Sequence, residues 1–123
     1  MPKKLLIIED DAALAHALSE KLGGAGFEVA LALDGEAGLK NLENSRPALL
    51  VLDLILPRKS GFEVLETVRE SEEFKKLPVL ILTNLESPSD IERTFSLGIS
   101  GYLVKANYSL DEIVKKIEQI LAS

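Results

Sequence analysis

The sequence predicts an α/β fold in which five parallel strands form one doubly wound sheet with helices on both faces. Three observations indicate this class. Strand-like and helix-like segments alternate five times along the chain. The run 48–57 is continuously apolar except for Asp53, which is typical of a strand covered on both faces. Polar side chains follow most of the strand-like runs, as expected at the ligand-binding edge of such a sheet.

The first strand–helix unit lies at the start of the chain. Residues 5–8 are a leucine and isoleucine run that favours a strand. Asp11 is placed to cap the next helix, whose inward face repeats at helical spacing through Leu14, Leu18 and Leu22. The glycine-rich stretch that follows ends this helix and turns the chain into a second strand, expected at 27–31.

The second helix leads into the strand that carries Asp53. Asp34 opens this helix, and Ala37 and Leu42 are expected to face inward. The third strand ends at Asp53, and Pro57 stops it within four residues. An ionised aspartate beside so apolar a strand is costly unless a cation or hydrogen-bond donors compensate it. Asp53 is therefore predicted to be reactive or metal-binding.

The last three helices each begin with a capping-box pattern, a hydroxyl residue followed three positions later by a carboxylate. The pairs are Ser60 with Glu63, Ser87 with Asp90, and Ser109 with Glu112. Strand-like runs between these helices cover 78–82 and 101–104. For five strands the expected order is 2-1-3-4-5, which places strands 1 and 3 together at the topological switch point.

Composition indicates a small acidic globular domain over residues 1–123. The chain is 46% hydrophobic, which argues against disorder. The formal net charge of -6 disfavours a nucleic-acid-binding surface, which would need a basic patch. The sequence has no cysteine, which excludes disulfides and thiolate metal sites. We expect no signal peptide, no membrane-spanning stretch and a cytoplasmic location.

Side chains suited to chemistry follow four of the predicted strands. They are Glu9 and Asp10 after the first strand, Asp53 after the third, Thr83 after the fourth and Lys105 after the fifth. Because parallel strands all end at the same edge, the predicted order gathers these groups in one cleft. Clustered carboxylates repel one another and favour a hard cation such as Mg²⁺. A lysine and a hydroxyl suit the oxygens of a phosphoryl group.

In these motifs, and in their order along the whole chain, the sequence resembles the receiver domains of response regulators in two-component signalling. The likeness is to the chemotaxis-type single-domain receiver with a flavodoxin-like fold. It implies that Asp53 is the phospho-acceptor and that Thr83 and Lys105 contact the phosphoryl group. It also implies a switch role for Thr83 and Tyr102, although Tyr102 is equally explained as a partly buried strand aromatic.

The resemblance further implies a cofactor and partners. Mg²⁺ would be held by the side chains of Glu9, Asp10 and Asp53 and by the backbone carbonyl of Ile55. A phosphohistidine of a sensor histidine kinase or phosphotransfer protein would supply the phosphoryl group. The surface formed by the fourth helix, the fifth strand and the fifth helix would relay the phosphorylation state to a downstream protein partner. We expect no catalysis beyond the protein's own phosphorylation and dephosphorylation, no direct nucleic acid, no membrane, and a monomer or weak phosphorylation-linked dimer.

Several residues depart from the family pattern. Ala106 follows Lys105 where the family usually has proline, often after a cis bond. A cis bond before a non-proline residue costs about 3 kcal/mol, so this bond is either trans or strained. Asn84 stands where the family favours a small residue, and it is expected to crowd the site or to donate a hydrogen bond. Ile55 and Leu85 are apolar where many relatives are polar, which predicts slow autodephosphorylation because attacking water is hindered.

The residues at the strand ends bear on three alternative functions. A receiver-like interaction module that no longer responds to phosphorylation is the main alternative, because Asn84 and Ala106 alter the loops that read Asp53. A flavin-binding module would need a hydroxyl- or glycine-rich phosphate loop where this chain has three acidic residues, 9–11. An aspartate-based phosphatase would place its nucleophile after the first strand in an Asp-x-Asp arrangement, which is absent. His16 has no ligand partner at useful spacing and is expected on the surface.

Overall fold

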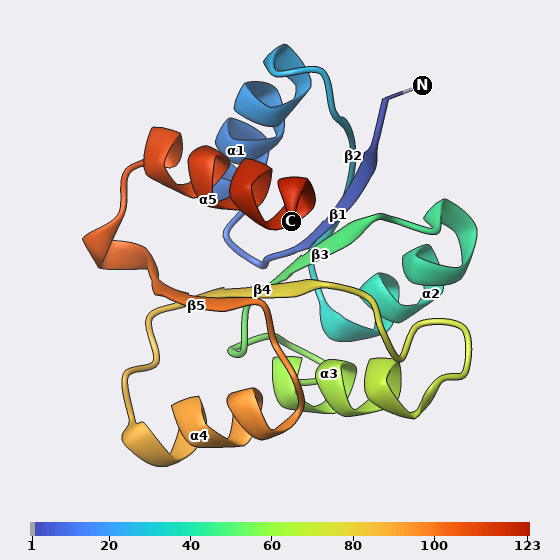
Figure 1. Cartoon of the computed structure of the whole chain (residues 1–123). Helices are drawn as coiled ribbons and strands as arrows, with labels where there is room; N and C mark the ends of the chain where they lie inside the picture. The colour runs from blue at the N-terminus through green and yellow to red at the C-terminus, as the bar shows by residue number, and fades with distance from the viewer. Residues whose placement is uncertain (1) are drawn as a thin grey trace.

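Five parallel strands form the central sheet of the computed structural model, which describes residues 2–123 (Figure 1). The strand order is β2-β1-β3-β4-β5, as predicted, and neighbouring strands in this order pair in parallel. The strands are β1 (Lys4–Ile8), β2 (Glu28–Ala32), β3 (Leu49–Leu52), β4 (Val79–Thr83) and β5 (Gly101–Val104).

Helices cover both faces of this sheet (Figure 1). On one face lie α1 (Ala12–Gly24) and α5 (Leu110–Ala122). On the other face lie α2 (Gly35–Ser45), α3 (Gly61–Glu70) and α4 (Pro88–Ser96). A short 3-10 helix, η1 (Lys105–Asn107), joins β5 to α5 and was not predicted from the sequence.

Alternate residues of each strand build two apolar cores, one on each side of the sheet. Leu5 points into the core under α1 and α5, where it joins Leu18 and Ile117. Leu6 points into the opposite core, where it joins Val64 of α3. Because both faces of the central strands are covered, their sequences are apolar at nearly every position.

Two strands begin and end one residue later than predicted. Phe27 is excluded from β2 because its N–H donates to the carbonyl of Leu22 at the end of α1 (3.0 Å). Pro78 has no N–H for the sheet, and β4 begins at the next residue. At its other end, β4 extends to Thr83, which pairs with Val104 of β5. The predicted site residue Thr83 therefore belongs to the sheet itself.

Most helix starts agree with the sequence. Asp11 accepts from the Leu14 N–H at 3.1 Å, and Asp34 accepts from the Ala37 N–H at 2.8 Å. The capping boxes of α3 and α5 are both complete: Ser60 with Glu63, and Ser109 with Glu112. These contacts satisfy backbone N–H groups that have no partner inside the helix.

The capping box predicted for α4 is wrong. Ser87 precedes the helix and Pro88 takes its first position, but the Ser87 side chain makes no capping hydrogen bond. Its hydroxyl instead lies 3.0 Å from the hydroxyl of Ser89. The helix therefore begins without the reciprocal bonds to Asp90 that the pattern indicated.

Candidate functional site

The strand ends bring the predicted site residues together at one edge of the sheet. Glu9 follows β1 and Asp53 follows β3, and both are almost fully buried, with exposed fractions of 3% and 4%. Their backbones extend the strand pairing, since the Asp53 N–H donates to the carbonyl of Ile8 (3.1 Å). Thr83 is also buried, at the end of β4. Polar side chains this deep need compensating partners.

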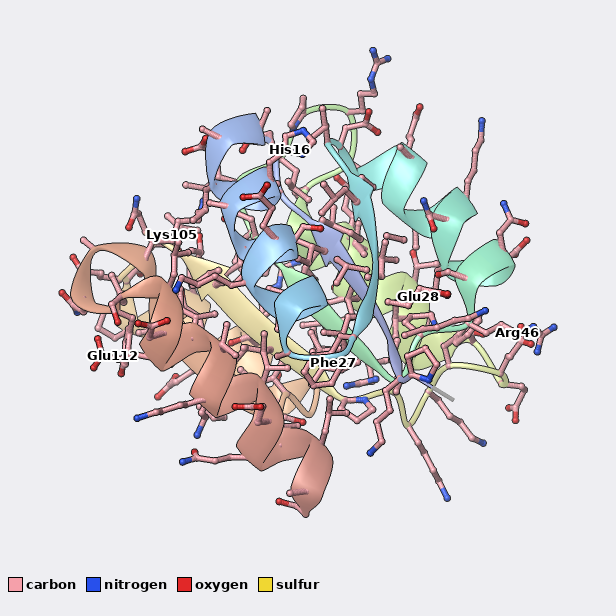
Figure 2. The ribbon with its side chains drawn as sticks, turned by 90° about the horizontal axis from the view of Figure 1, so that it is seen from above. His16, Phe27, Glu28, Arg46, Lys105 and Glu112 are labelled. Carbon is pink, nitrogen blue, oxygen red and sulfur yellow. The ribbon has the colours of Figure 1, made fainter. Side chains whose placement is uncertain are left out.

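Lys105 supplies that compensation. Its ammonium donates to Glu9 Oε1 at 2.5 Å and to Asp53 Oδ2 at 2.7 Å. The other oxygen of the Asp53 carboxylate, Oδ1, accepts from the backbone N–H of Ile55 at 3.2 Å. One cation therefore faces two buried carboxylates, an arrangement that is favourable only when the geometry is tight. Figure 2 shows Lys105 near the start of α5, viewed from the side of α1 and α5.

The pKa values of the two carboxyl groups shift in opposite directions. Burial, and then the contact with Asp53, raises the pKa of Glu9 from its ordinary 4.5 to about 7. Burial alone would raise the pKa of Asp53 as well, but its hydrogen bonds with Glu9 and Lys105 hold that pKa below its ordinary value. As the pH falls toward 7, Glu9 is therefore the first of the two carboxylates to take up a proton, and Asp53 stays ionised.

The same edge fits a divalent cation. Carboxylate oxygens of Glu9, Asp10 and Asp53 all lie within 4.8 Å of one another. Glu9 Oε2 is buried and, among the residues described, has no hydrogen-bond partner. Leaving such an oxygen without a partner is costly. A hard cation with oxygen ligands would satisfy it, and Asp10 is exposed, so water can complete the coordination shell.

Gly61 holds the backbone of Asp53 in place, and the sequence reasoning missed it. Its N–H donates to the carbonyl of Leu54 at 3.0 Å. A Cβ atom added at Gly61 would lie 2.1 Å from the Asp53 carbonyl oxygen, so any larger residue must displace the site. A glycine in the first position of a helix beside a candidate nucleophile is the signal that would have found it.

The loop after β4 contacts the region around β5 at two points. The half-buried Tyr102 donates from its hydroxyl to the carbonyl of Leu85 at 2.7 Å. Burial, and then the negative charges of Asp90 and Asp53, raises the pKa of Tyr102, so its hydroxyl remains a donor. The Asn84 carboxamide oxygen accepts from the backbone N–H of Ala106 at 3.2 Å.

These contacts revise the expectations for the two unusual loop residues. Asn84 was expected to crowd the site or to donate a hydrogen bond, whereas in this contact it accepts one. The Lys105–Ala106 bond is trans, because no cis peptide bond occurs within residues 2–123. Ile55 is 55% exposed, which places an apolar side chain on the surface two residues from Asp53. His16 is exposed on α1, as expected (Figure 2).

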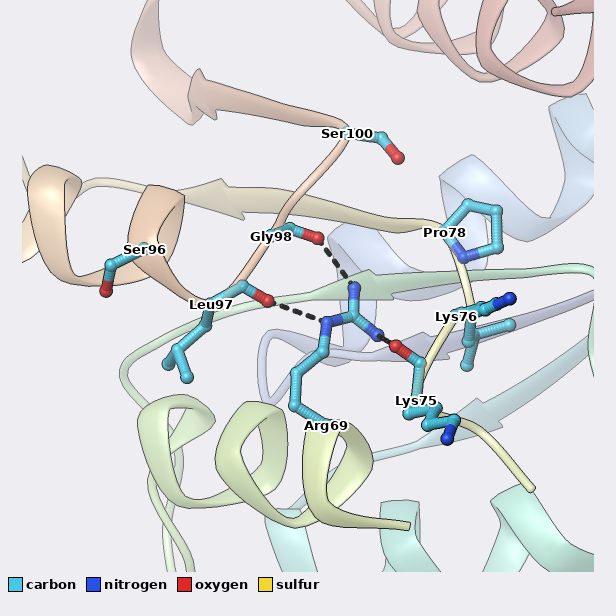
Figure 3. Close-up of a pocket in the computed structure, with 9 residues that line it drawn as sticks. Arg69, Lys75, Lys76, Pro78, Ser96, Leu97, Gly98 and Ser100 are labelled. Atoms are coloured by element: carbon cyan, nitrogen blue, oxygen red, sulfur yellow. Dashed lines mark hydrogen bonds between the residues drawn. The ribbon is translucent and has the colours of Figure 1, made fainter. Parts of the chain in front are cut away.

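A separate pocket lies at the opposite edge of the sheet, beside Pro78, and is built around Arg69 (Figure 3). The Arg69 guanidinium donates to the carbonyls of Leu97 at 2.7 Å and Gly98 at 2.8 Å, and to that of Lys75 at 3.2 Å. Its hydrogen-bonding capacity is thus used on backbone carbonyls. We assign Arg69 a structural role, which is to tie the turn after α4 to the end of α3.

No helix among the residues described is long and apolar enough to cross a membrane.

Comparisons with known proteins agree in sequence and in structure. The model of the response regulator receiver domain matches residues 5–118. Response regulator MprA of Mycobacterium sp. (strain KMS) is 34% identical over 121 residues, which are 98% of this chain and 51% of MprA. The chain thus spans about half the length of the curated relatives it matches.

Solved structures extend the likeness to the whole fold. A response regulator from Chloroflexus aurantiacus J-10-fl is 35% identical with a TM-score of 0.89, and the match covers 100% of both chains. The Mn(2+)-bound form of response regulator Rcp1 is 33% identical with a TM-score of 0.85, covering 96% of this chain and 93% of the other.

Proposed function

Because this chain belongs to the response regulator receiver domain family, we propose that it is a phosphorylation-dependent switch in which Asp53 accepts a phosphoryl group. The donor is a phosphohistidine of a sensor histidine kinase or phosphotransfer protein. The observation that carries this proposal is the buried, ionised carboxylate of Asp53, held by Lys105 beside the partnerless oxygen of Glu9. Receiver domains are signalling proteins rather than classical enzymes, so the reaction serves to change state.

The transfer follows from the state of Asp53. Its carboxylate is the nucleophile that forms the new O–P bond. The P–N bond of the donor breaks, and its electron pair stays on the imidazole nitrogen of the departing histidine. The low pKa of Asp53 keeps the attacking oxygen ionised. The Lys105 ammonium, now 2.7 Å from Oδ2, offsets the charge that accumulates on the phosphoryl oxygens.

Mg²⁺ is the proposed cofactor. Glu9, Asp10 and Asp53 would hold it with their side chains, and Ile55 with its backbone carbonyl. When bound, the ion supplies charge neutralisation at the phosphoryl oxygens. The partnerless Glu9 Oε2 supports this role, and so does the metal bound to the relative Rcp1.

Phosphorylation of Asp53 changes the conformation at the ends of β4 and β5 and in the loops that follow them. Thr83 and Lys105 turn toward the new phosphoryl oxygens, and Tyr102 follows because its hydroxyl is bonded to Leu85. The outcome is a changed surface on α4, β5 and α5 for a downstream protein. Phe95 of α4 is 55% exposed and offers an apolar contact there.

Phosphorylation by acetyl phosphate in the presence of Mg²⁺ tests this proposal, with intact mass as the readout. The wild type is expected to gain one phosphoryl group and Asp53→Asn none. Asp11→Asn is the matched control, because Asp11 lies beside the acidic cluster but caps α1; it should be phosphorylated like the wild type. A wild type that gains no mass would refute the proposal and favour the interaction module that does not respond to phosphorylation.

A further inference from the structure

We infer that Asn84 is a positioning residue: its side chain joins the loop after β4 to the turn that carries Lys105, so that the two loops move as one unit. This inference rests on the proposed function, because the turn that Asn84 holds presents Lys105 to Asp53. It concerns a contact between two neighbouring segments of this chain: residues 83–85, at the end of β4, and residues 105–107, which form η1.

Three consecutive residues, the last residue of β4 and the two that follow it, face three different partners. Thr83 lies beside Asp53 and helps to lower the pKa of that carboxyl. Asn84 accepts from the Ala106 N–H at 3.2 Å, and Leu85 accepts from Tyr102 at 2.7 Å. The loop is therefore anchored to the site, to the turn after β5 and to β5 itself within three residues.

The hydrogen bond from Ala106 satisfies a backbone N–H group of the η1 turn. The first N–H groups of a helical turn have no acceptor within the turn, and they require one from outside. Asn84 provides that acceptor from a different loop. A proline at 106 has no N–H and cannot make this bond, so the contact depends on the particular pair of Asn84 and Ala106.

Little else holds this turn. None of the η1 residues is buried, and the backbone bond that closes the turn, from the Tyr108 N–H to the Lys105 carbonyl, is long at 3.4 Å. The Lys105 side chain is bound to Glu9 and Asp53, which are the partners that it leaves when a phosphoryl group arrives. While Lys105 changes partners, the hydrogen bond between Asn84 and Ala106 keeps the η1 turn at a fixed position relative to Thr83.

Two measurements test this role. The first is amide hydrogen exchange at Ala106 in the unphosphorylated protein, which does not depend on the proposed function. The second is the initial rate of phosphorylation by acetyl phosphate with Mg²⁺. Asn84→Ala is expected to speed exchange at Ala106 and to slow phosphorylation, each by roughly two- to fivefold, as the loss of one exposed hydrogen bond allows.

Controls separate positioning from a general effect on the loops. Asn107→Ala removes an exposed asparagine from the same turn and should change neither measurement. Asn84→Asp keeps an acceptor oxygen, so Ala106 should stay protected. In an Ala106→Pro background, Asn84→Ala should have no further effect on the phosphorylation rate, since the donor is already absent.

The outcomes distinguish this inference from the proposed function. Unchanged exchange at Ala106 in Asn84→Ala would overturn the contact. An unchanged phosphorylation rate in Asn84→Ala, beside an active wild type, would overturn the positioning role alone. A wild type that takes no phosphoryl group would overturn the proposed function, and with it the role of Asn84 in phosphorylation.

Discussion

At the scale of single residues, Glu9 is the carboxyl group whose ionised form is most disfavoured among the residues described. One of its oxygens bonds to Lys105, while the other is buried without a partner among the residues described. Its pKa is raised from 4.5 to about 7, mainly by burial. The folded protein therefore prefers Glu9 protonated, and the stability that this group contributes is full below pH 4.5 and is lost as the pH rises through 7.

The first prediction is that Glu9→Gln stabilises the metal-free protein at alkaline pH. The substitution removes a buried charge while Asp53 still pairs with Lys105. At pH 8 the free energy of unfolding should exceed that of the wild type by about 1 to 3 kcal/mol, and the difference should close toward pH 4.5. Urea unfolding in the presence of a chelator measures it. A variant that is less stable than the wild type at pH 8 would contradict the assignment.

The second prediction, also at the residue scale, concerns the lifetime of the phosphorylated protein. Ile55 and Leu85 are apolar residues two positions after Asp53 and Thr83, and we expect their side chains to hinder an attacking water. We expect the phosphoryl group on wild-type protein to persist for much longer than seconds with Mg²⁺ present, and Ile55→Asn to shorten its lifetime. Loss of the phosphoryl group can be followed by intact mass after the donor is removed. A wild-type half-life of seconds would refute this expectation.

At the scale of elements, α4 is the helix least anchored in either core. Within Pro88–Ser96, Thr94 is the buried residue, and its hydroxyl bonds back to the carbonyl of Ile91. Arg93 lies 4.3 Å from the ring centre of Phe62 and 3.3 Å from Glu66 of α3. Arg69 ties the turn at Leu97 and Gly98 to the end of α3. Polar contacts of this kind position α4 without fixing it in a core, so the proposed change of state at the site would need to break few apolar contacts to displace it.

The third prediction is that Arg69→Gln loosens the end of α4 selectively. The substitution removes the fork of N–H groups that bonds the two carbonyls of the turn. Amide exchange at 97–100 should rise several-fold, while exchange in β1 and β3 stays near that of the wild type. Lys75→Gln is the matched control, because Lys75 lines the same pocket but offers Arg69 only its backbone carbonyl. An equal rise across all strands would indicate general destabilisation and contradict the local role.

At the scale of the whole molecule, the sheet order converts separated sequence positions into one site. Asp53 and Lys105 are 52 residues apart along the chain and 2.7 Å apart in space. Their meeting was predictable, since polar residues that follow apolar strands must share an edge once the order is known. The start of β5 and the cap at Ser60 were predictable for similar local reasons.

The features that sequence reasoning missed depend on contacts between distant segments. Gly61 matters because α3 approaches the backbone of Asp53, and the bond between Asn84 and Ala106 depends on how two loops are placed. The failed cap at Ser87 has a more local cause, because Ser89 offers a competing hydroxyl. Local patterns describe what a residue can do, and tertiary packing selects which partner it meets.

A phosphoryl group on Asp53 is expected to change the loops after β4 and β5. The most direct test records amide NMR spectra with Mg²⁺, before and after addition of beryllofluoride, which mimics the phosphoryl group. We expect the resonances of Thr83, Tyr102 and Ala106 to shift in the wild type and to stay in place in Asp53→Asn. Spectra of the wild type that do not change, or changes that are equal in Asp53→Asn, would contradict it.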